Sequence, residues 1–379
     1  MNVLALTPGG ADLARRIGVA LPEAVLWLPA KISPTSNLES CISRADQCWQ
    51  PPLRETFERL FTSGQPLVFI GALGILVRMA APFLVDKRTD PPVVVVDEAG
   101  QFVISVLSGH WGGANDLALE ISRQIGATPV ITTATDVVGL PAVDTFARHI
   151  GAVPEPWSNV KKISSAMLRG APIEWLCDHQ FYDALVKQNR TYPWKLWDPA
   201  ETAKRKDERE TVVVSTVESA LPQEEALKVL LTHRVGNDSA TLRLRPRFIV
   251  AGLGCRKGVP TETVMGAIDQ AFQQVGIHPD CLLSIASAWV KAEERAFLET
   301  ARIRKVPFQT YKSDEIEECC TRHRDDIPGS DFVAQKIGVK AVCEPTALLA
   351  HRRARLLLKK RVLESVTVAL AEVPWPLSD

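Results

Sequence analysis

The segment Ser108-Gly109-His110-Trp111-Gly112-Gly113-Ala114-Asn115 combines three glycines with a histidine, a serine and an asparagine. Glycines let a backbone turn tightly and approach a ligand, and the first N–H groups of a following helix favour an anion or a carbonyl oxygen. Because histidine transfers protons near neutral pH, His110 is a candidate general acid or base. Taken alone, the motif fits a purely structural strand-to-helix turn equally well, and it is not the G-x-S-x-G motif of serine hydrolases.

Polar residues follow several apolar, strand-like segments near this motif. The ligand site of a parallel α/β sheet lies beyond the carboxyl ends of its strands, so we expect these residues to meet there. One of the acidic residues would orient His110 or shuttle a proton. The alternative for the first pair is a simple hairpin turn. The residues concerned are Asp97 and Glu98 after Val93–Val96, Ser108 and Gly109 after Phe102–Leu107, Thr132 and Thr133 after Ile131, and Asp136.

Three basic residues precede these strands. Lys87 and Arg88 lie in the charged run Asp86–Asp90, and Arg78 lies in an otherwise apolar helical segment. Arginine matches a carboxylate with two parallel hydrogen bonds, so these side chains are candidates for binding substrate carboxylates. A solvated charged loop is the alternative for Lys87 and Arg88, whereas Arg78 on a buried helix would need a partner.

A second glycine-rich segment, Gly252–Gly258, follows a strand-like run in the last third of the chain. Its spacing loosely resembles a dinucleotide loop, but the next strand is not followed by an acidic residue that could hold a ribose. We therefore favour an anion-binding loop. Its candidate residues are Gly254, Cys255, Arg256 and Lys257, with Lys291 further along. Metal binding is poorly supported, because Cys319, Cys320 and His323 lack a second ligand pair.

Composition narrows the functional classes. The chain has 379 residues with equal numbers of basic and acidic side chains, so neither a nucleic acid nor an anionic membrane is expected as its main partner. Eight cysteines occur without a CxxC pair. The start resembles no signal peptide, and no apolar run is long enough to span a bilayer. A reducing, cytoplasmic location is the expectation.

Alternating strand and helix patterns predict a multidomain α/β protein. We expect an N-terminal α/β domain with a largely parallel sheet over residues 1–150, a small middle α/β domain or linker domain over 151–245, and a C-terminal α/β domain over 246–379. Residues 75–83 have the pattern of a buried helix, and Ala114–Ile125 that of an amphipathic helix with Gly126 as its cap. A strand over Phe248–Ala251 should precede the loop Gly252–Gly258, and Thr211–Val217 is another candidate strand.

Read together, these motifs resemble cobalamin biosynthesis protein G (CbiG), with a last third similar to the CobE proteins. The resemblance is most specific over Gly71–Asp136 and weakest between Pro154 and Arg245. Its motifs are Gly71-Ala72-Leu73-Gly74-Ile75, Lys87-Arg88-Thr89-Asp90-Pro91, Val95-Val96-Asp97-Glu98-Ala99-Gly100, Ser108-Gly109-His110, Gly112-Gly113-Ala114-Asn115, Thr132-Thr133-Ala134-Thr135-Asp136 and, in the last third, Gly252–Gly258, Cys343-Glu344-Pro345 and Val366-Thr367-Val368-Ala369.

The resemblance implies cobalt-precorrin-5A hydrolase activity in anaerobic vitamin B12 synthesis. Such an enzyme opens the δ-lactone of the contracting macrocycle and releases the C20 carbon with its methyl group as acetaldehyde, giving cobalt-precorrin-5B. The substrate brings the cobalt, so no cofactor is expected. Arg78, Lys87 and Arg88 would hold its carboxylates, His110 would activate water, and N–H groups near Gly109 and Gly112–Gly113 would stabilise the oxyanion.

Two other functions stay open at this point. A corrinoid-binding carrier would use the same basic and glycine-rich segments without chemistry. A dinucleotide-dependent oxidoreductase would use Gly252–Gly258. A homodimer and contacts with other enzymes of the cobalamin pathway are also compatible with the sequence.

Overall fold

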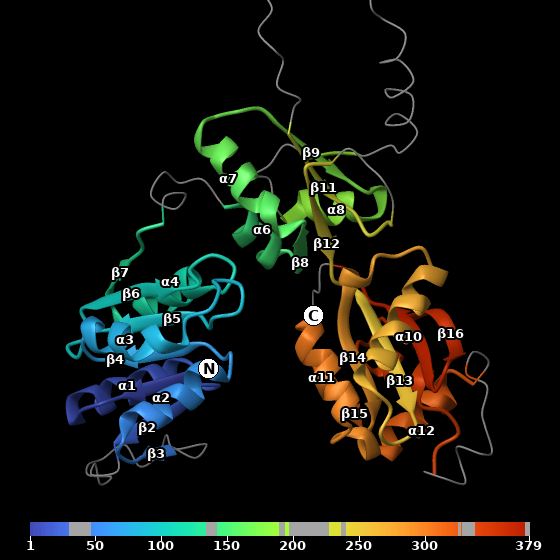
Figure 1. Cartoon of the computed structure of the whole chain (residues 1–379), viewed down its shortest axis with the longest axis horizontal. Coiled ribbons are helices and arrows are strands. Elements are labelled where there is room, and N and C mark those ends of the chain that lie inside the picture. Colours follow the sequence, from blue (N-terminus) through green and yellow to red (C-terminus); the bar gives the residue numbers. More distant parts are fainter. Residues whose placement is uncertain are drawn as a thin grey trace, which may run out of the picture. The chain divides into compact units, whose positions relative to one another are not determined.

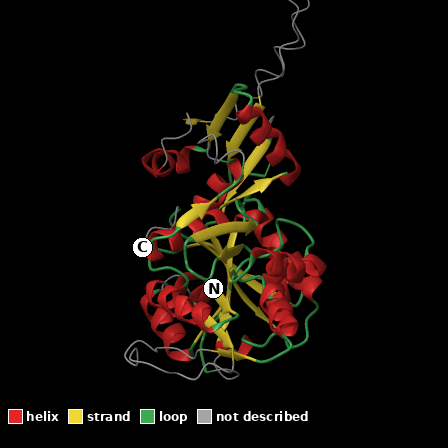
Figure 2. Ribbon diagram, turned by 90° about the vertical axis from the view of Figure 1, so that its left-hand side faces the viewer, coloured by secondary structure: helices red, strands yellow, loops and turns green. Residues whose placement is uncertain are grey.

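The computed structural model describes residues 1–29, 47–133, 142–188, 194–196, 227–235, 240–324, 327 and 338–375. The chain divides into two compact units, Met1–Phe146 (unit 1) and Ala147–Asp379 (unit 2). Unit 1 runs from blue to teal in Figure 1 and unit 2 from green to red. Figure 2 shows helices packed beside the strands throughout the described chain. The expected multidomain α/β class is therefore confirmed, while the three domain bounds stay a prediction.

Unit 1 contains a seven-stranded sheet in the order β3-β2-β1-β4-β5-β6-β7. Every neighbouring pair is parallel except β5 and β6, which are antiparallel. The strands are β1 (Asn2–Ala5), β2 (Val25–Pro29), β3 (Gln47–Trp49), β4 (Leu67–Ile70), β5 (Val93–Val96), β6 (Phe102–Leu107) and β7 (Thr128–Val130).

Apolar clusters cover both faces of this sheet. One contains Leu13 and Ile17 of a first helix with Ile121 of a later one, and the other contains Phe57 and Phe69. Since both faces are covered, the four valines of β5 are all buried, as the continuous apolar run predicts. The helices of unit 1 are α1 (Pro8–Ala20), α2 (Leu53–Thr62), α3 (Leu73–Ala80), η1 (Ala81–Phe83) and α4 (Ala114–Ile125), and α6 (Val143–His149) begins in it.

The direction of β6 corrects one expectation about the sheet. We call the edge at which β1 to β5 end the carboxyl edge and the opposite edge the amino edge. Because β6 runs antiparallel to β5, it ends at the amino edge, and β7 ends there too. The prediction that Asp97 and Ser108 lie at the same edge is therefore wrong: Asp97 follows β5 at the carboxyl edge, and Ser108 follows β6 at the amino edge.

Unit 2 contains two five-stranded sheets, ordered β10-β9-β11-β12-β8 and β15-β14-β13-β17-β16. The first comprises β8 (Ala152–Glu155), β9 (Ile173–Cys177), β10 (Trp194–Leu196), β11 (Leu227–Leu231) and β12 (Leu242–Pro246). The second comprises β13 (Ile249–Cys255), β14 (Leu282–Ala288), β15 (Phe308–Tyr311), β16 (Arg355–Leu363) and β17 (Val366–Glu372). The helices are η2 (Trp157–Asn159), α7 (Val160–Leu168), α8 (His179–Gln188), α10 (Thr261–Gln274), η3 (Pro279–Cys281), η4 (Trp289–Lys291), α11 (Arg295–Arg304), α12 (Ser313–Arg322) and α14 (Cys343–Leu349).

Two further expectations need correction. The helix at residues 75–83 is not buried: α3 buries only Leu76 and Ala80, while Ile75 is 44% exposed. The segment Gly252–Gly258 is not all loop, because β13 continues to Cys255. Thr211–Val217 lies outside the described residues.

Candidate functional site

The turn from β6 to α4 is built around Ser108. This residue has a φ of 55°, in the left-handed region that non-glycine residues rarely adopt. The main chain then folds back on itself, because the N–H of Ala114 donates to the Ser108 carbonyl at 3.2 Å and that of Asn115 to the Gly109 carbonyl at 3.0 Å. Strained backbone of this kind concentrates at functional sites.

Two of the glycines in the turn are required by geometry. A Cβ on Gly112 would lie 2.4 Å from the Ser108 Cβ and 2.6 Å from its carbonyl oxygen. Gly113, which precedes α4, has a φ of 93°. A side chain at either position would force the turn open. Packing and conformation, and not ligand binding alone, therefore explain the glycine-rich sequence.

Two backbone N–H groups in the turn are available to a ligand. The Gly113 N–H is not, because it donates to the His110 carbonyl at 3.1 Å. Among the described residues, the N–H groups of Gly109 and Gly112 donate no hydrogen bond. The N–H groups of Gly109 and Gly112 can therefore donate hydrogen bonds to an oxyanion, whereas that of Gly113 cannot.

Asn115 connects the turn to the neighbouring strand end. Its buried side chain accepts a hydrogen bond from Ser105 at 2.7 Å and donates one to Thr133 Oγ1 at 3.0 Å. Thr132, beside Thr133, is exposed at the same edge. Asn115 thus fixes the start of α4 against the segment after β7, so its side chain positions the site.

An acidic residue that sequence reasoning missed lies beside His110. The Nδ1 atom of His110 is 3.7 Å from Oδ1 of Asp144, at the start of α6. Asp144 is 4% exposed, and the same oxygen accepts the Thr145 N–H at 3.1 Å. A carboxylate on the Nδ1 side orients an imidazole so that Nε2 can accept a proton. The sequence signal that could have identified Asp144 is an acidic residue among the buried positions of a helix.

The acidic residues that the sequence suggested lie elsewhere. Asp97 closes the β5–β6 hairpin, accepting the N–H groups of Ala99 at 3.1 Å and Phe102 at 2.5 Å. Glu98 accepts a hydrogen bond from the Thr7 hydroxyl, also at the carboxyl edge. The structure therefore brings neither to His110 and favours the hairpin alternative for this pair. Asp136 lies outside the described residues.

The charged run before β5 does reach the Ser108 turn, because the Ser108 hydroxyl donates to the Asp90 carbonyl at 2.8 Å. Within this run Arg88 is paired with Asp86 at 2.8 Å. Their hydrogen bond lowers the pKa of the Asp86 carboxyl and raises that of the Arg88 guanidinium. Lys87 is exposed. Arg78 is exposed as well, and not half-buried as the sequence pattern suggests.

The candidate residues of the last third form a separate group in unit 2. Gly254 lies within β13, where an added Cβ would be 2.6 Å from Thr367 Oγ1, so strand packing explains this glycine. Burial raises the pKa of the Cys255 thiol despite the nearby Lys291 ammonium, which favours the inert form over a reactive thiolate. Arg256 and Lys257 are exposed beyond the strand.

Lys291 has a partner that sequence reasoning missed. Its Nζ lies 2.6 Å from Glu294 Oε2, and the other carboxylate oxygen accepts the Gly258 N–H at 3.3 Å. Burial acts to raise the pKa of Glu294, but these two hydrogen bonds together with the positive charges of Lys291 and Lys257 leave the pKa lowered. A cavity of about 600 Å³ adjoins this pair, with Glu262, Glu294 and Glu299 in its wall.

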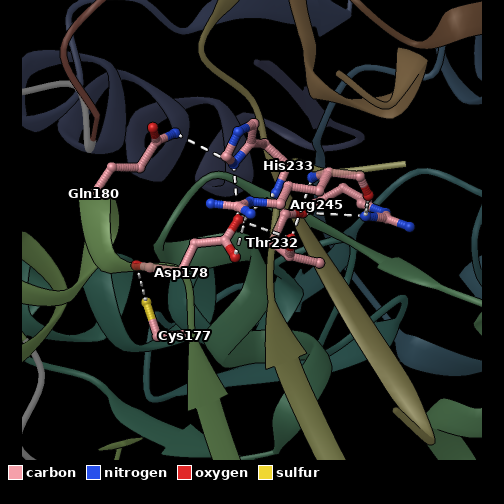
Figure 3. A network of polar contacts seen from close by, with 7 residues as sticks. Cys177, Asp178, Gln180, Thr232, His233 and Arg245 are labelled. Carbon is pink, nitrogen blue, oxygen red and sulfur yellow. Dashed lines mark hydrogen bonds and ion pairs between the residues drawn. The ribbon is translucent and has the colours of Figure 1, made fainter. Parts of the chain in front are cut away.

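A second polar network lies at the ends of two parallel strands in unit 2. Asp178 follows β9, and Thr232 and His233 follow β11 (Figure 3). Oδ2 of the buried Asp178 lies 2.7 Å from both Thr232 Oγ1 and His233 Nδ1. Arg245 donates to the Thr232 carbonyl and pairs with Glu155 at 2.7 Å. Because the His278 N–H donates to the His233 carbonyl, the network also joins the two sheets of unit 2.

The described residues contain neither a metal-binding cluster nor a membrane-spanning helix. No group of three or more His, Cys, Asp and Glu side chains is placed to hold a metal ion. None of the helices in these ranges combines the length and apolar character needed to cross a membrane.

The fold and the site define a multidomain α/β protein with a histidine and a buried carboxylate at a glycine-rich strand-to-helix turn. Family models match most of this chain: "Cobalamin synthesis G N-terminal" over residues 55–136, "Cobalamin biosynthesis central region" over 141–246 and "Cobalamin synthesis G C-terminus" over 249–371. The chain belongs to the cobalamin biosynthesis protein G (CbiG) family, which confirms the resemblance seen in its motifs.

Three curated relatives illustrate the match. The cobalt-precorrin-5A hydrolase of Priestia megaterium is 30% identical over 379 residues, covering 98% of this chain and 95% of the relative. The cobalt-precorrin-5A hydrolase of Salmonella typhimurium is 33% identical over 372 residues, covering 96% and 95%. Protein CobE of a Sinorhizobium species is 33% identical over 137 residues, covering 36% of this chain and 87% of the relative.

Proposed function

We propose that this protein is a cobalt-precorrin-5A hydrolase that acts on a cobalt-containing tetrapyrrole. The observation that carries the proposal is the match along nearly the whole chain to two relatives of that name. Hydrolysis of the substrate's δ-lactone needs a base for water and donors for the carbonyl oxygen. The Ser108–Asn115 turn offers both kinds of group.

In the proposed first step, His110 Nε2 accepts a proton from water while the water oxygen bonds to the lactone carbonyl carbon. The Asp144 carboxylate on the Nδ1 side stabilises the imidazolium that forms. The N–H groups of Gly109 and Gly112 donate to the developing oxyanion. Expulsion of the ring oxygen, which takes the proton back from His110, leaves a hydroxyl group and a carboxylic acid, which releases its proton to solvent and becomes a carboxylate. The hydroxyl group on C20 then gives up its proton as the bond from C20 to the macrocycle breaks. C20 leaves with its methyl group as acetaldehyde, and the macrocycle keeps the electron pair and takes up a proton.

Substrate binding is assigned to the cations of the same region. Lys87 and Arg78 are exposed, so their positive charges can attract the carboxylate side chains of the substrate. The Arg88–Asp86 ion pair stabilises the conformation of the segment Asp86–Asp90. Thr132 and Thr133 lie at the same edge of the sheet. Arg256 and Lys257 belong to unit 2, and a role for them in carboxylate binding stays a prediction from the sequence. The protein supplies no metal in this proposal, because the cobalt arrives within the substrate.

Incubation of the purified protein with cobalt-precorrin-5A tests the function, with released acetaldehyde measured by coupling to an NADH-dependent alcohol dehydrogenase. We expect stoichiometric acetaldehyde and the mass of cobalt-precorrin-5B. His110→Ala should lower turnover by roughly 10²- to 10⁴-fold, whereas the control His351→Ala in unit 2 should not. Tight binding of unchanged substrate would overturn the proposed hydrolase function in favour of a carrier. Full activity of His110→Ala would show that His110 has no role in the mechanism.

A further inference from the structure

The helix α3 and the segment after it form an exposed apolar surface. Five large apolar side chains between positions 73 and 85 are 40–84% exposed. They are Leu73, Ile75, Val77, Leu84 and Val85. A helix that is apolar all round is normally buried, yet α3 buries only Leu76 and Ala80. Exposed apolar patches of this kind mark binding surfaces.

Cations outnumber carboxylates along this segment, with Arg78, Lys87 and Arg88 against Asp86 and Asp90. Arg78 is the only ionisable residue of α3, and it lies in the last turn of the helix. Lys87 follows Val85 closely, and among the described residues neither cation has an ion-pair partner. Asp86 is paired with Arg88, and the Asp90 carboxylate accepts the backbone N–H groups of Val85 and Asp86, which leaves Arg78 and Lys87 as the cations without an acidic partner in the described part of the chain. An occupant of this surface should therefore combine an apolar face with anionic groups.

The surface is continuous with the candidate active site. The run that carries Lys87 is held to the Ser108 turn by the Ser108–Asp90 hydrogen bond of 2.8 Å. The eight residues of α3 span about 12 Å at 1.5 Å per residue, which suits the face of one tetrapyrrole ring. The cavity in unit 2 fits such a ligand less well, because its wall has three glutamates and one arginine, Arg295, and this net negative charge would repel carboxylates.

We propose that this α3 surface is the platform on which the tetrapyrrole macrocycle lies, with its apolar face against Ile75 and Val77 and its carboxylates on Arg78 and Lys87. The inference rests on the proposed function for the identity of the ligand. It adds to that function an apolar contact surface that the mechanism does not require. The platform would place the ring beside the Ser108 turn, where His110 lies.

Binding of uroporphyrin III, an octacarboxylate tetrapyrrole without a lactone, tests the platform separately from catalysis. Its fluorescence anisotropy is titrated with the full-length protein at low salt. We expect Ile75→Ser combined with Val77→Ser to weaken binding roughly tenfold. A tenfold change in the dissociation constant corresponds to losing about half of the free energy gained by burying one large apolar side chain. Arg78→Gln should also weaken binding, and its effect should shrink as salt is raised.

Matched controls lie in the same unit. Val19→Ser removes an apolar side chain that is 58% exposed on α1, and Arg123→Gln removes an exposed cation from α4. Neither should change binding. All five substituted positions are exposed, so thermal unfolding should confirm that each variant folds.

Two outcomes of the binding experiment would overturn the platform. One is equal binding by wild type and the Ile75/Val77 variant. The other is a change in oligomeric state of that variant with unchanged binding, which would show that a second copy covers α3. The proposed function fails differently, because it requires acetaldehyde from cobalt-precorrin-5A. Uroporphyrin binding through α3 without acetaldehyde release would sink the hydrolase alone, and acetaldehyde release by the variant with unchanged KM would sink the platform alone.

Discussion

At the residue scale, the central feature is the placement of His110 beside Asp144. The sequence singles out His110 because glycines surround it. It does not single out Asp144, since this residue belongs to a helix beyond the undescribed residues 134–141 and only the fold brings it close. For Asp97 and Glu98 the sequence errs in the opposite direction: it singles them out as acidic partners of His110, but they follow β5, which ends at the other edge of the sheet.

We predict that Asp144→Asn lowers kcat roughly tenfold or more with little change in KM, because an amide cannot stabilise the imidazolium at the same oxygen. The measurement is acetaldehyde release under saturating cobalt-precorrin-5A. Asp144→Glu keeps the charge and should restore part of the rate. If both variants lost activity only in proportion to a loss of folded protein, Asp144 would have a structural role alone.

At the element scale, local patterns predicted where strands and helices lie better than how they are directed. The valine run of β5 and the amphipathic α4 appear as expected, because burial on one or two faces leaves a clear pattern in the sequence. Strand direction leaves no such pattern, so the reversal of β6 was missed. The exposure of α3 was missed for a related reason: an apolar pattern cannot distinguish a helix buried in the fold from one that binds a ligand.

A glycine pair tests the geometry of the β6–α4 turn. Gly112→Ala should destabilise unit 1 by about 1–3 kcal/mol, the usual cost of overpacking, because its Cβ would meet Ser108 at 2.4 Å. Gly74→Ala is the matched control, since a Cβ there has no atom within 4 Å. In the helical position of Gly74, alanine should stabilise by roughly 0.5–1 kcal/mol. Urea unfolding of both variants measures the difference, and equal stabilities would contradict the described turn.

At the scale of the whole molecule, the sequence predicted an α/β protein of several domains, and the described residues form three sheets in two compact units. The contacts that join the two sheets of unit 2 were beyond sequence reasoning. They depend on single polar residues at strand ends, such as Asp178 and His233, whose partners lie far away in the chain. Apolar periodicity contains no information about such pairs.

The stability of the contacts that join the two sheets of unit 2 should depend on pH through His278. Burial, with the nearby Arg245 charge, lowers the pKa of His278 below its ordinary 6.5, while Asp280 and Glu155 oppose the shift. The folded protein thus binds this proton less readily than the unfolded chain. The stability that depends on neutral His278 is fully present above about pH 6.5 and is lost as the pH falls below it. Urea unfolding between pH 5 and 8 should show a smaller acid loss for His278→Gln; an unchanged profile would contradict this.

The reversed strand β6 also determines the electric field around the Ser108 turn. Because β6 ends at the amino edge, α4 begins there, and the partial positive charge of its first N–H groups lies at the site. The helix α3, which follows β4 and returns toward β5, has its partial negative end on the same side, where Arg78 occupies the last turn. One reversed strand therefore provides a site in which a helix dipole favours anionic charge, and a single arginine offsets the opposing dipole.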